Sequence, residues 1–128
     1  KTLFYKYNIK MKPEKAAAFL AKSHNSAEPY PEALEVITKI KTYNKVCIIS
    51  DTDNRMIESL IAKFGINNVY SSQDLHAYKF NKSGILFKKA IKDFSINPEE
   101  MLHIGDGTND VLGASIIGAD SVWINGIK

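Results

Sequence analysis

Residues 101–124 read MLHIGDGTNDVLGASIIGADSVWI, and this stretch decides the fold class. An apolar run at 101–104 leads into a glycine-rich acidic loop. A helical pattern follows at 111–117, ends at Gly118, and precedes a second apolar run at 121–124. Short all-apolar runs are typical of strands that are covered on both faces. A strand, a helix and a strand in this order predict two parallel strands of one sheet.

The same alternation of apolar runs and helical patterns extends back to about residue 31. Further strands are expected at 46–49 and 68–71, and further helices at 11–22, 32–43, 54–64 and 83–94. The sequence therefore predicts an α/β fold, a three-layer Rossmann-like sandwich with a parallel sheet and helices on both faces. Ligands of such sheets bind at the carboxyl ends of the strands, so the loops after the strands are where a site is expected.

Composition and charge exclude several classes of protein. The 128 residues are 45% hydrophobic and 24% charged, which is typical of a globular protein. No apolar run approaches the roughly 20 residues that cross a membrane, so no membrane partner is expected. All of the 17 basic residues except Arg55 are Lys, spread along predicted helices, so we expect no nucleic-acid partner. The single Cys47 fits a reducing, cytoplasmic location and a buried position in the first strand.

The most specific chemical signal is the loop from Gly105 to Asp110, which follows the strand predicted at 101–104. Its two carboxylates, Asp106 and Asp110, are four positions apart, and a hard cation such as Mg²⁺ would offset their repulsion. The alternative is that Asp110 or Asn109 only caps the next helix. A dinucleotide-binding fingerprint does not fit, because position 110 is not Gly.

Two other loops carry groups that suit a phosphate. Ser50 ends an apolar strand just before a helix, where a hydroxyl beside free N–H groups holds a phosphate oxygen. The alternative is that Ser50, Thr52 or Asp53 caps that helix. Lys79 and Lys82 precede the helix predicted at 83–94, and either ammonium would neutralise a phosphoryl group. The alternative is that both lysines are only solvated.

Two segments together resemble the haloacid dehalogenase superfamily of phosphohydrolases. They are PYPEALEVITKIKTYNKVCIISDTDNRMIESLIAKFGI at 29–66 and SGILFKKAIKDFSINPEEMLHIGDGTNDVLGASIIGADSVWI at 83–124. The resemblance implies a Mg²⁺-dependent phosphatase that acts on a small phosphorylated metabolite.

The resemblance also implies roles for individual residues. Ser50, with its neighbour Asp51, would form the phosphate-binding loop, and Asp106 and Asp110 would serve the metal. The motif lysine is ambiguous, because the family position falls on Asn81, so Lys82 is slightly preferred over Lys79.

The chain departs from the family at its first motif, a strand that ends in Asp-x-Asp and supplies the nucleophile and the general acid/base. No Asp precedes Asp51 in this sequence, and three explanations stay open. In the favoured one, the nucleophile lies on an N-terminal segment upstream that completes the sheet, 1–28 is the tail of a helical cap, and 29–128 is the core.

In the second explanation, 2–7 is a degenerate first strand with Lys6 and Asn8 near the two Asp positions. The protein would then be a non-catalytic pseudo-phosphatase that serves as a binding or regulatory domain. In the third, Asp51-Thr52-Asp53 is itself the first motif.

A few remaining side chains are expected to have ordinary roles. His24, His76 and His103 show no metal-ligand spacing, so each is expected to be structural or exposed. Tyr78 and Phe80 flank Lys79 and are expected to belong to the core or its rim, with contact to a bound substrate as the alternative.

Overall fold

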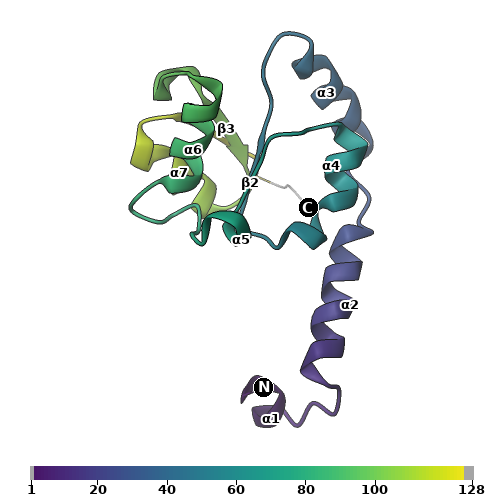
Figure 1. Ribbon diagram of the computed structural model, residues 1–128. Coiled ribbons are helices and arrows are strands. Elements are labelled where there is room, and N and C mark those ends of the chain that lie inside the picture. Colours follow the sequence, from purple (N-terminus) through teal and green to yellow (C-terminus); the bar gives the residue numbers. More distant parts are fainter. Residues whose placement is uncertain (1, 126–128) are drawn as a thin grey trace.

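The computed structural model describes residues 2–125 as an α/β fold with parallel strand pairs (Figure 1). Its strands are β1 (Ile48–Ser50), β2 (Val69–Ser71), β3 (Leu102–Gly105) and β4 (Asp120–Trp123). Its helices, in which η marks a 3₁₀-helix, are α1 (Thr2–Lys6), α2 (Pro13–Asn25), α3 (Pro31–Lys41), η1 (Asn54–Met56), α4 (Glu58–Phe64), α5 (Ser72–Leu75), α6 (Ile85–Phe94), η2 (Pro98–Glu100) and α7 (Thr108–Ile117). No helix within 2–125 has the length and apolar character needed to span a membrane.

The four strands form two separate pairs. β1 pairs with β2, with Ile49 opposite Tyr70, and β3 pairs with β4, with Ile104 opposite Val122. Within residues 2–125, β1 and β3 each pair with one neighbour only. The predicted α/β class with parallel strands is therefore confirmed, whereas the strands form two short sheets instead of one.

The helices α4 and α7 end at the predicted residues 64 and 117. Gly65 and Gly118 follow α4 and α7 in the left-handed conformation, with φ of 57° and 78°, which costs glycine little. The end of α4 is also held by Lys41, whose ammonium donates to the carbonyl oxygens of Phe64 and Gly65 at 2.8 and 2.7 Å. A cation at this end of a helix offsets the partial negative charge of its terminal carbonyls.

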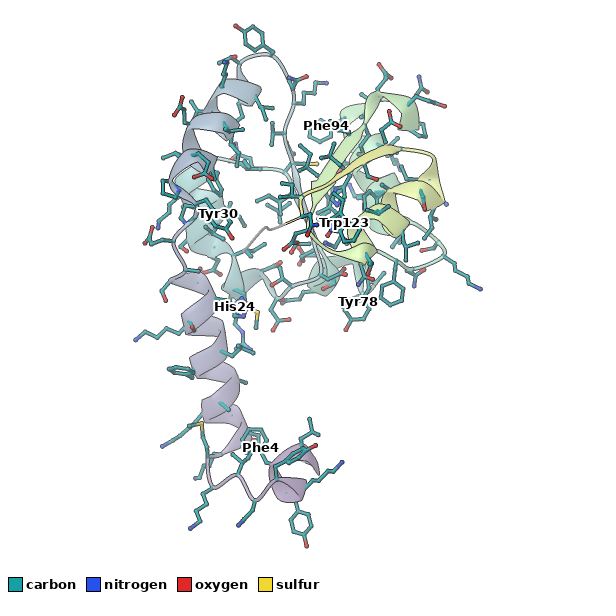
Figure 2. The ribbon with its side chains drawn as sticks, turned by 180° about the vertical axis from the view of Figure 1, so that it is seen from behind. Phe4, His24, Tyr30, Tyr78, Phe94 and Trp123 are labelled. Carbon is teal, nitrogen blue, oxygen red and sulfur yellow. The ribbon has the colours of Figure 1, made fainter. Side chains whose placement is uncertain are left out.

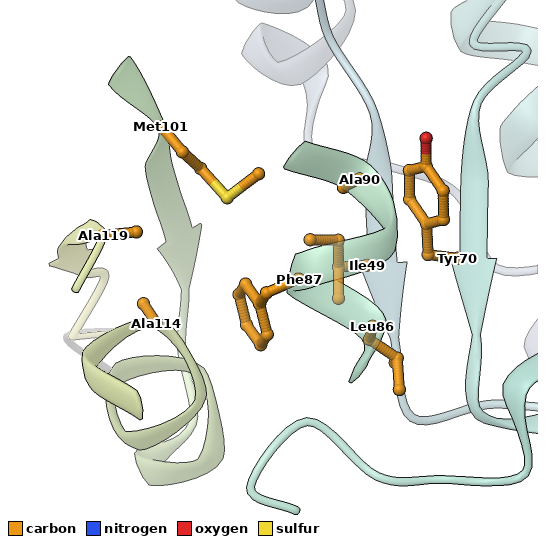
Figure 3. Close-up of a cluster of buried hydrophobic side chains, with 8 residues drawn as sticks. All are labelled: Ile49, Tyr70, Leu86, Phe87, Ala90, Met101, Ala114 and Ala119. Carbon is orange, nitrogen blue, oxygen red and sulfur yellow. The ribbon is translucent and has the colours of Figure 1, made fainter. Parts of the chain in front are cut away.

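One core joins the two strand pairs. Leu86, Phe87 and Ala90 of α6 are fully buried. Figure 3 shows α6 between β3 on one side and β1 and β2 on the other. The other buried members of this cluster are Ile49, Tyr70, Met101, Ala114 and Ala119. Burying a phenylalanine side chain stabilises a fold by about 2–3 kcal/mol, so α6 accounts for much of what holds the pairs together.

The expectation that the 101–104 strand is covered on both faces is wrong. Leu102 and Ile104 are 57% and 49% exposed, and Val122, opposite Ile104 on the neighbouring strand, is 46% exposed. Successive side chains of a strand point to opposite faces, so Leu102 and Ile104 share the face opposite His103. The helices α6 and α7 contact the sheets, but nothing within 2–125 covers this second face.

The N-terminal helices α1 and α2 project away from the core (Figure 1). Figure 2 places Phe4 far from Trp123, with His24 near the end of α2 that meets the core. That end contacts η1 and α4, and the backbone N–H of Ser59 donates to Asn25 Oδ1 at 2.9 Å.

The explanation in which 2–7 is a degenerate strand is not supported, because Thr2–Lys6 is helical. The Tyr7 N–H donates to the Leu3 carbonyl at 3.0 Å, and the Ile9 N–H donates to the Phe4 carbonyl at 2.8 Å. Local hydrogen bonds of this kind satisfy the backbone N–H and C=O groups of a segment that has no neighbouring strand. The division at residue 28 stays a prediction.

Candidate functional site

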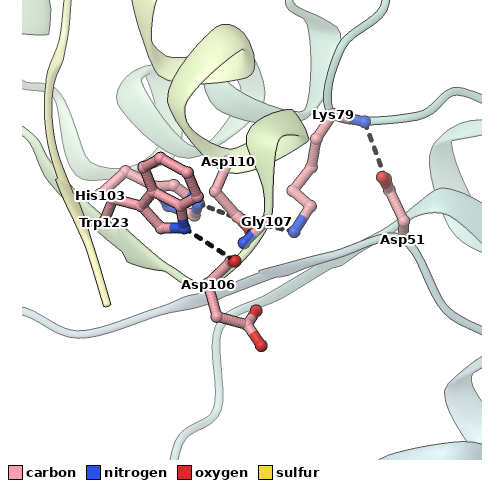
Figure 4. A network of polar contacts seen from close by, with 7 residues as sticks. All are labelled: Asp51, Lys79, His103, Asp106, Gly107, Asp110 and Trp123. Atoms are coloured by element: carbon pink, nitrogen blue, oxygen red, sulfur yellow. Dashed lines mark hydrogen bonds and ion pairs between the residues drawn. The ribbon is translucent and has the colours of Figure 1, made fainter. Parts of the chain in front are cut away.

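Lys79 links loops from both strand pairs (Figure 4). Its backbone N–H donates to Asp51 Oδ1 at 2.7 Å, in the loop after β1. Its ammonium pairs with Asp110, beyond the loop that follows β3. The structure thus brings together three of the predicted site residues at the carboxyl ends of β1 and β3, where parallel sheets bind ligands.

Asp110 is the most tightly held side chain of this group, and it is only 4% exposed. Its Oδ1 accepts from the Lys79 ammonium and from His103 Nε2, the latter at 2.8 Å, and its Oδ2 accepts from the Gly107 N–H at 3.0 Å. Burial alone would raise the pKa of this carboxyl, but the hydrogen bonds from Lys79, His103 and Gly107 outweigh burial and lower the pKa. Asp110 is therefore held as a carboxylate.

The local sequence explains this placement. Asp110 is the third residue of α7, after the N-cap Gly107, and its carboxylate accepts from the Gly107 N–H as in a capping box. The alternative in which Asp110 or Asn109 is the N-cap residue is therefore not seen. Gly105 passes so close that a Cβ there would lie 2.2 Å from the Asp110 carboxyl carbon. Any other residue at position 105 would displace Asp110, so the glycine is needed for close approach.

Asp106 differs from Asp110 although they belong to the same loop. Its side chain is exposed, points away from Asp110 in Figure 4, and has no hydrogen bond or ion pair within 2–125. Only its backbone is held, because the Trp123 indole N–H donates to the Asp106 carbonyl at 2.9 Å. The Asp106 carboxylate therefore remains available to an outside ligand.

The donor set fits Mg²⁺ through one side chain. Mg²⁺ prefers oxygen ligands, keeps several waters, and is often held by one or two carboxylates and a substrate phosphate. The Asp106 carboxylate meets this requirement, whereas the oxygens of Asp110 already accept three protein donors. Residues 2–125 contain no group of three His, Cys, Asp or Glu side chains suited to hold a metal by themselves.

The two candidate lysines lie in different surroundings. The Lys79 side chain is 14% exposed and ion-paired. Lys82 is exposed, and its ammonium has no hydrogen bond or ion pair within the described part of the chain. Two successive turns, closed by Asn81 N–H to Tyr78 O and by Gly84 N–H to Asn81 O, decide which side chain faces the acidic loop. The family position, which falls on Asn81, takes no account of these turns, so the geometry favours Lys79 where the sequence favoured Lys82.

Ser50 stands at the end of β1 and is half-buried, as expected for a residue at the carboxyl end of a strand. Asp53 precedes η1, but its side chain makes no capping bond and pairs instead with Arg55 at 3.6 Å. The capping alternative is therefore not seen for Asp53. Tyr78 and Phe80 stack on each other with ring centroids 6.2 Å apart, and both are exposed beside Lys79.

Sequence reasoning missed the place of His103 in this group. Its Nε2 faces a carboxylate, so this nitrogen carries the proton and donates. Its ring meets the buried Phe87 ring edge-on at 5.0 Å, which connects the site to the core. The available signal was alternation along β3: His103 is two positions before Gly105, so both lie on the inward face.

Comparisons with known proteins agree with this arrangement. A family model described as haloacid dehalogenase-like hydrolase matches residues 5–118. A phosphoglycolate phosphatase from Haemophilus influenzae (strain 86-028NP) is 25% identical over 105 residues, which cover 78% of this chain and 46% of that protein. The chain therefore spans less than half of that relative's length.

Two solved structures are similar in fold. A dehalogenase with an intermediate complex has a TM-score of 0.75 and 23% identity, and the match covers 95% of this chain and 55% of that one. A HAD phosphatase from Thermococcus onnurineus has a TM-score of 0.72 and 22% identity over 98% of this chain and 59% of that one.

Proposed function

Because the chain belongs to the haloacid dehalogenase-like hydrolase family, we propose that it forms most of the core of a Mg²⁺-dependent phosphatase for a small phosphorylated metabolite. One observation carries the proposal: Lys79 is fixed between the loops of the two strand pairs, beside an acidic loop with one available carboxylate. A fixed cation at the ends of parallel strands suits an anionic group, and a phosphoryl group is the anion that also recruits Mg²⁺.

The described residues would divide the work of binding. Lys79 would neutralise the phosphoryl oxygens as a point charge, and the Ser50 hydroxyl would donate a hydrogen bond to one of them. Asp110 would keep the Lys79 ammonium oriented without contacting substrate. Asp106 would supply a carboxylate ligand to Mg²⁺, which when bound offsets negative charge on the phosphoryl oxygens.

The nucleophile is proposed to come from a strand outside 2–125 that inserts between β1 and β3. Two observations support this place. β1 pairs only with β2 and β3 only with β4 within 2–125, so each has one edge without a hydrogen-bonded neighbour. An unpaired edge is a template for a further strand. The exposed Leu102 and Ile104 on β3 would gain apolar neighbours from such a strand or from the chain that follows it. An Asp at its carboxyl end would then lie beside Ser50 and Asp106.

The test is hydrolysis of a generic aryl phosphate by the full native protein with Mg²⁺. We expect turnover that is lost on chelation and reduced about 100-fold or more by Asp106→Asn, since this change removes the carboxylate ligand but keeps the side-chain shape. Wild-type turnover no higher than that of the Asp106→Asn control would contradict the phosphatase and favour the non-catalytic binding domain.

A further inference from the structure

The main chain of Lys79 is held from two sides. On one side its N–H donates to Asp51 Oδ1 at 2.7 Å. On the other side its carbonyl oxygen lies against α7 at Gly113, where a Cβ would come within 2.6 Å of it. Both contacts are made by the main chain, whereas the Lys79 ammonium pairs with Asp110. The main-chain contacts set the position from which the side chain reaches Asp110.

We propose that Asp51 is a positioning residue, which holds Lys79 at the site through the Lys79 backbone N–H. The proposal rests on the phosphate role proposed for Lys79. A lysine side chain loses much rotamer freedom when it is ordered. Fixing its main chain reduces the number of conformations from which the side chain must be ordered at the site. A hydrogen bond from a backbone N–H to a carboxylate is charge-assisted and stronger than one to a neutral acceptor.

The position of Asp51 in the sequence gives the bond a second consequence. Asp51 is the covalent neighbour of Ser50 and the hydrogen-bond partner of Lys79. Ser50 and Lys79, which are proposed to bind the same phosphoryl group, are thus connected through the Asp51 carboxylate. This assigns Asp51 a role different from direct phosphate contact, in which its negative charge would oppose the ligand.

Asp53 offers a matched control in the same loop. It is exposed, its carboxylate pairs with Arg55 at 3.6 Å, and the hydrogen bond and ion pair of Lys79 go to Asp51 and Asp110 instead. Asp51→Ala removes the acceptor, whereas Asp51→Asn keeps a side-chain oxygen in the same place. A positioning role predicts that the Asn variant is partly rescued and that Asp53→Ala resembles the wild type.

The experiment measures acetylation of individual lysines by mass spectrometry in the full native protein, with exposed Lys82 as the internal reference. In the wild type, Lys79 should be acetylated more slowly than Lys82. Asp51→Ala should raise the Lys79 rate relative to Lys82 by about 10-fold, the factor that corresponds to loss of one charge-assisted hydrogen bond. Asp53→Ala should stay within about 2-fold of the wild type on the same scale, and Asp51→Asn, which keeps a neutral acceptor, should fall between the wild type and Asp51→Ala.

Unchanged protection of Lys79 in a folded Asp51→Ala protein would overturn the proposal. Should that variant not fold, amide exchange of wild-type Lys79 decides instead: the N–H must exchange more slowly than an unprotected amide, and free exchange would overturn the proposal. Neither measurement needs turnover, so both stand even if the protein proves not to be a phosphatase.

Inorganic phosphate, used as an inhibitor of aryl phosphate hydrolysis, tests the functional part. Asp51→Ala should weaken its inhibition and Asp51→Asn should restore it in part. Exposure of Lys79 without any weakening of phosphate inhibition would contradict the role of Lys79 in phosphate binding, and with it the functional part of the proposal.

Discussion

The helices α6 and α2 are of similar length and differ strongly in burial. In α6, Leu86, Phe87 and Ala90 have no exposed surface, and the Phe87 ring contacts His103. In α2, Ala21 is the one described residue that is buried, and Phe19 is 72% exposed. The contacts of α6 continue from Phe87 through His103 and Asp110 to Lys79, whereas the main contacts of α2 are with η1 and α4. Changes in α6 should therefore reach the site, and changes in α2 should not.

The largest effect is expected from Phe87→Ala. Removing a fully buried aromatic side chain should lower the free energy of unfolding by about 3–5 kcal/mol, because the lost burial and the cavity both count. Urea unfolding followed by circular dichroism measures this. A loss below about 1 kcal/mol would mean that α6 does not hold the two strand pairs together.

Asp110→Asn should come next. The change leaves the Lys79 ammonium without its counter-ion in a largely buried place, which should cost about 3 kcal/mol at neutral pH. Asp106→Asn, at an exposed position of the same loop, should stay within about 0.5 kcal/mol. Equal losses for the two variants in urea unfolding would contradict the different roles assigned to these carboxylates.

The pH dependence of the Asp110 effect has a definite sign. The pKa of Asp110 is lowered in the folded protein, so its contribution is fully present above the ordinary carboxyl pKa and is lost as pH falls through the folded pKa. The stability difference between the wild type and Asp110→Asn should narrow as pH falls below about 4. If this stability difference stays constant down to the lowest pH, the ionised Asp110 carboxylate does not account for the stabilisation of the fold.

Tyr70 on β2 should give a smaller effect, on the alkaline side. Its hydroxyl donates to Asp93 at 3.1 Å, and burial, followed by this bond, raises the pKa of Tyr70 to about 12. The raised pKa means that its contribution is complete below the ordinary pKa of 10 and is lost as pH rises from there to about 12. Tyr70→Phe should cost about 1 kcal/mol at pH 7 and should reduce the loss of stability in that alkaline range.

Cys47 titrates in the same alkaline range. Burial raises the pKa of Cys47 to about 11, so part of the alkaline loss of stability is expected to remain in Tyr70→Phe, where the charge of Cys47 no longer acts on a tyrosine hydroxyl. A variant that loses stability above pH 10 as steeply as the wild type would contradict the account of Tyr70.

The smallest effect is expected in α2, the more exposed of the two helices. Phe19→Ala removes an aromatic side chain as Phe87→Ala does, but from an exposed position of α2. The free energy of unfolding should change by about 0.5 kcal/mol or less. A loss that approaches that of Phe87→Ala would mean that α2 packs against the core more closely than its contacts indicate.

Helix and strand positions were largely predictable, because periodicity and glycine stop signals are local. Gly65 and Gly118 end α4 and α7 where the sequence placed those ends. Burial was less predictable, because an apolar run indicates that a strand is buried but does not identify the element that packs against it. Leu102 and Ile104 therefore carry the pattern of a doubly covered strand but are exposed within 2–125.

The acidic loop at the site was predictable from spacing, whereas the separate roles of its two carboxylates were not. The environment of Asp110 is set by Lys79, which is 31 positions away, and by the inward face of β3, which presents His103. Such contacts exist only once the strand pairs and α6 are assembled. The choice between Lys79 and Lys82 depends on turns between residues 78 and 84 for the same reason.

The central claim is that Lys79, held by Asp51 and Asp110, is the lysine that meets the phosphoryl group. The most direct measurement compares kcat/KM for an aryl phosphate between Lys79→Ala and Lys82→Ala in the full native protein. We expect a loss of about 100-fold or more for Lys79→Ala and less than about 3-fold for Lys82→Ala. A larger loss for Lys82→Ala than for Lys79→Ala would contradict the account.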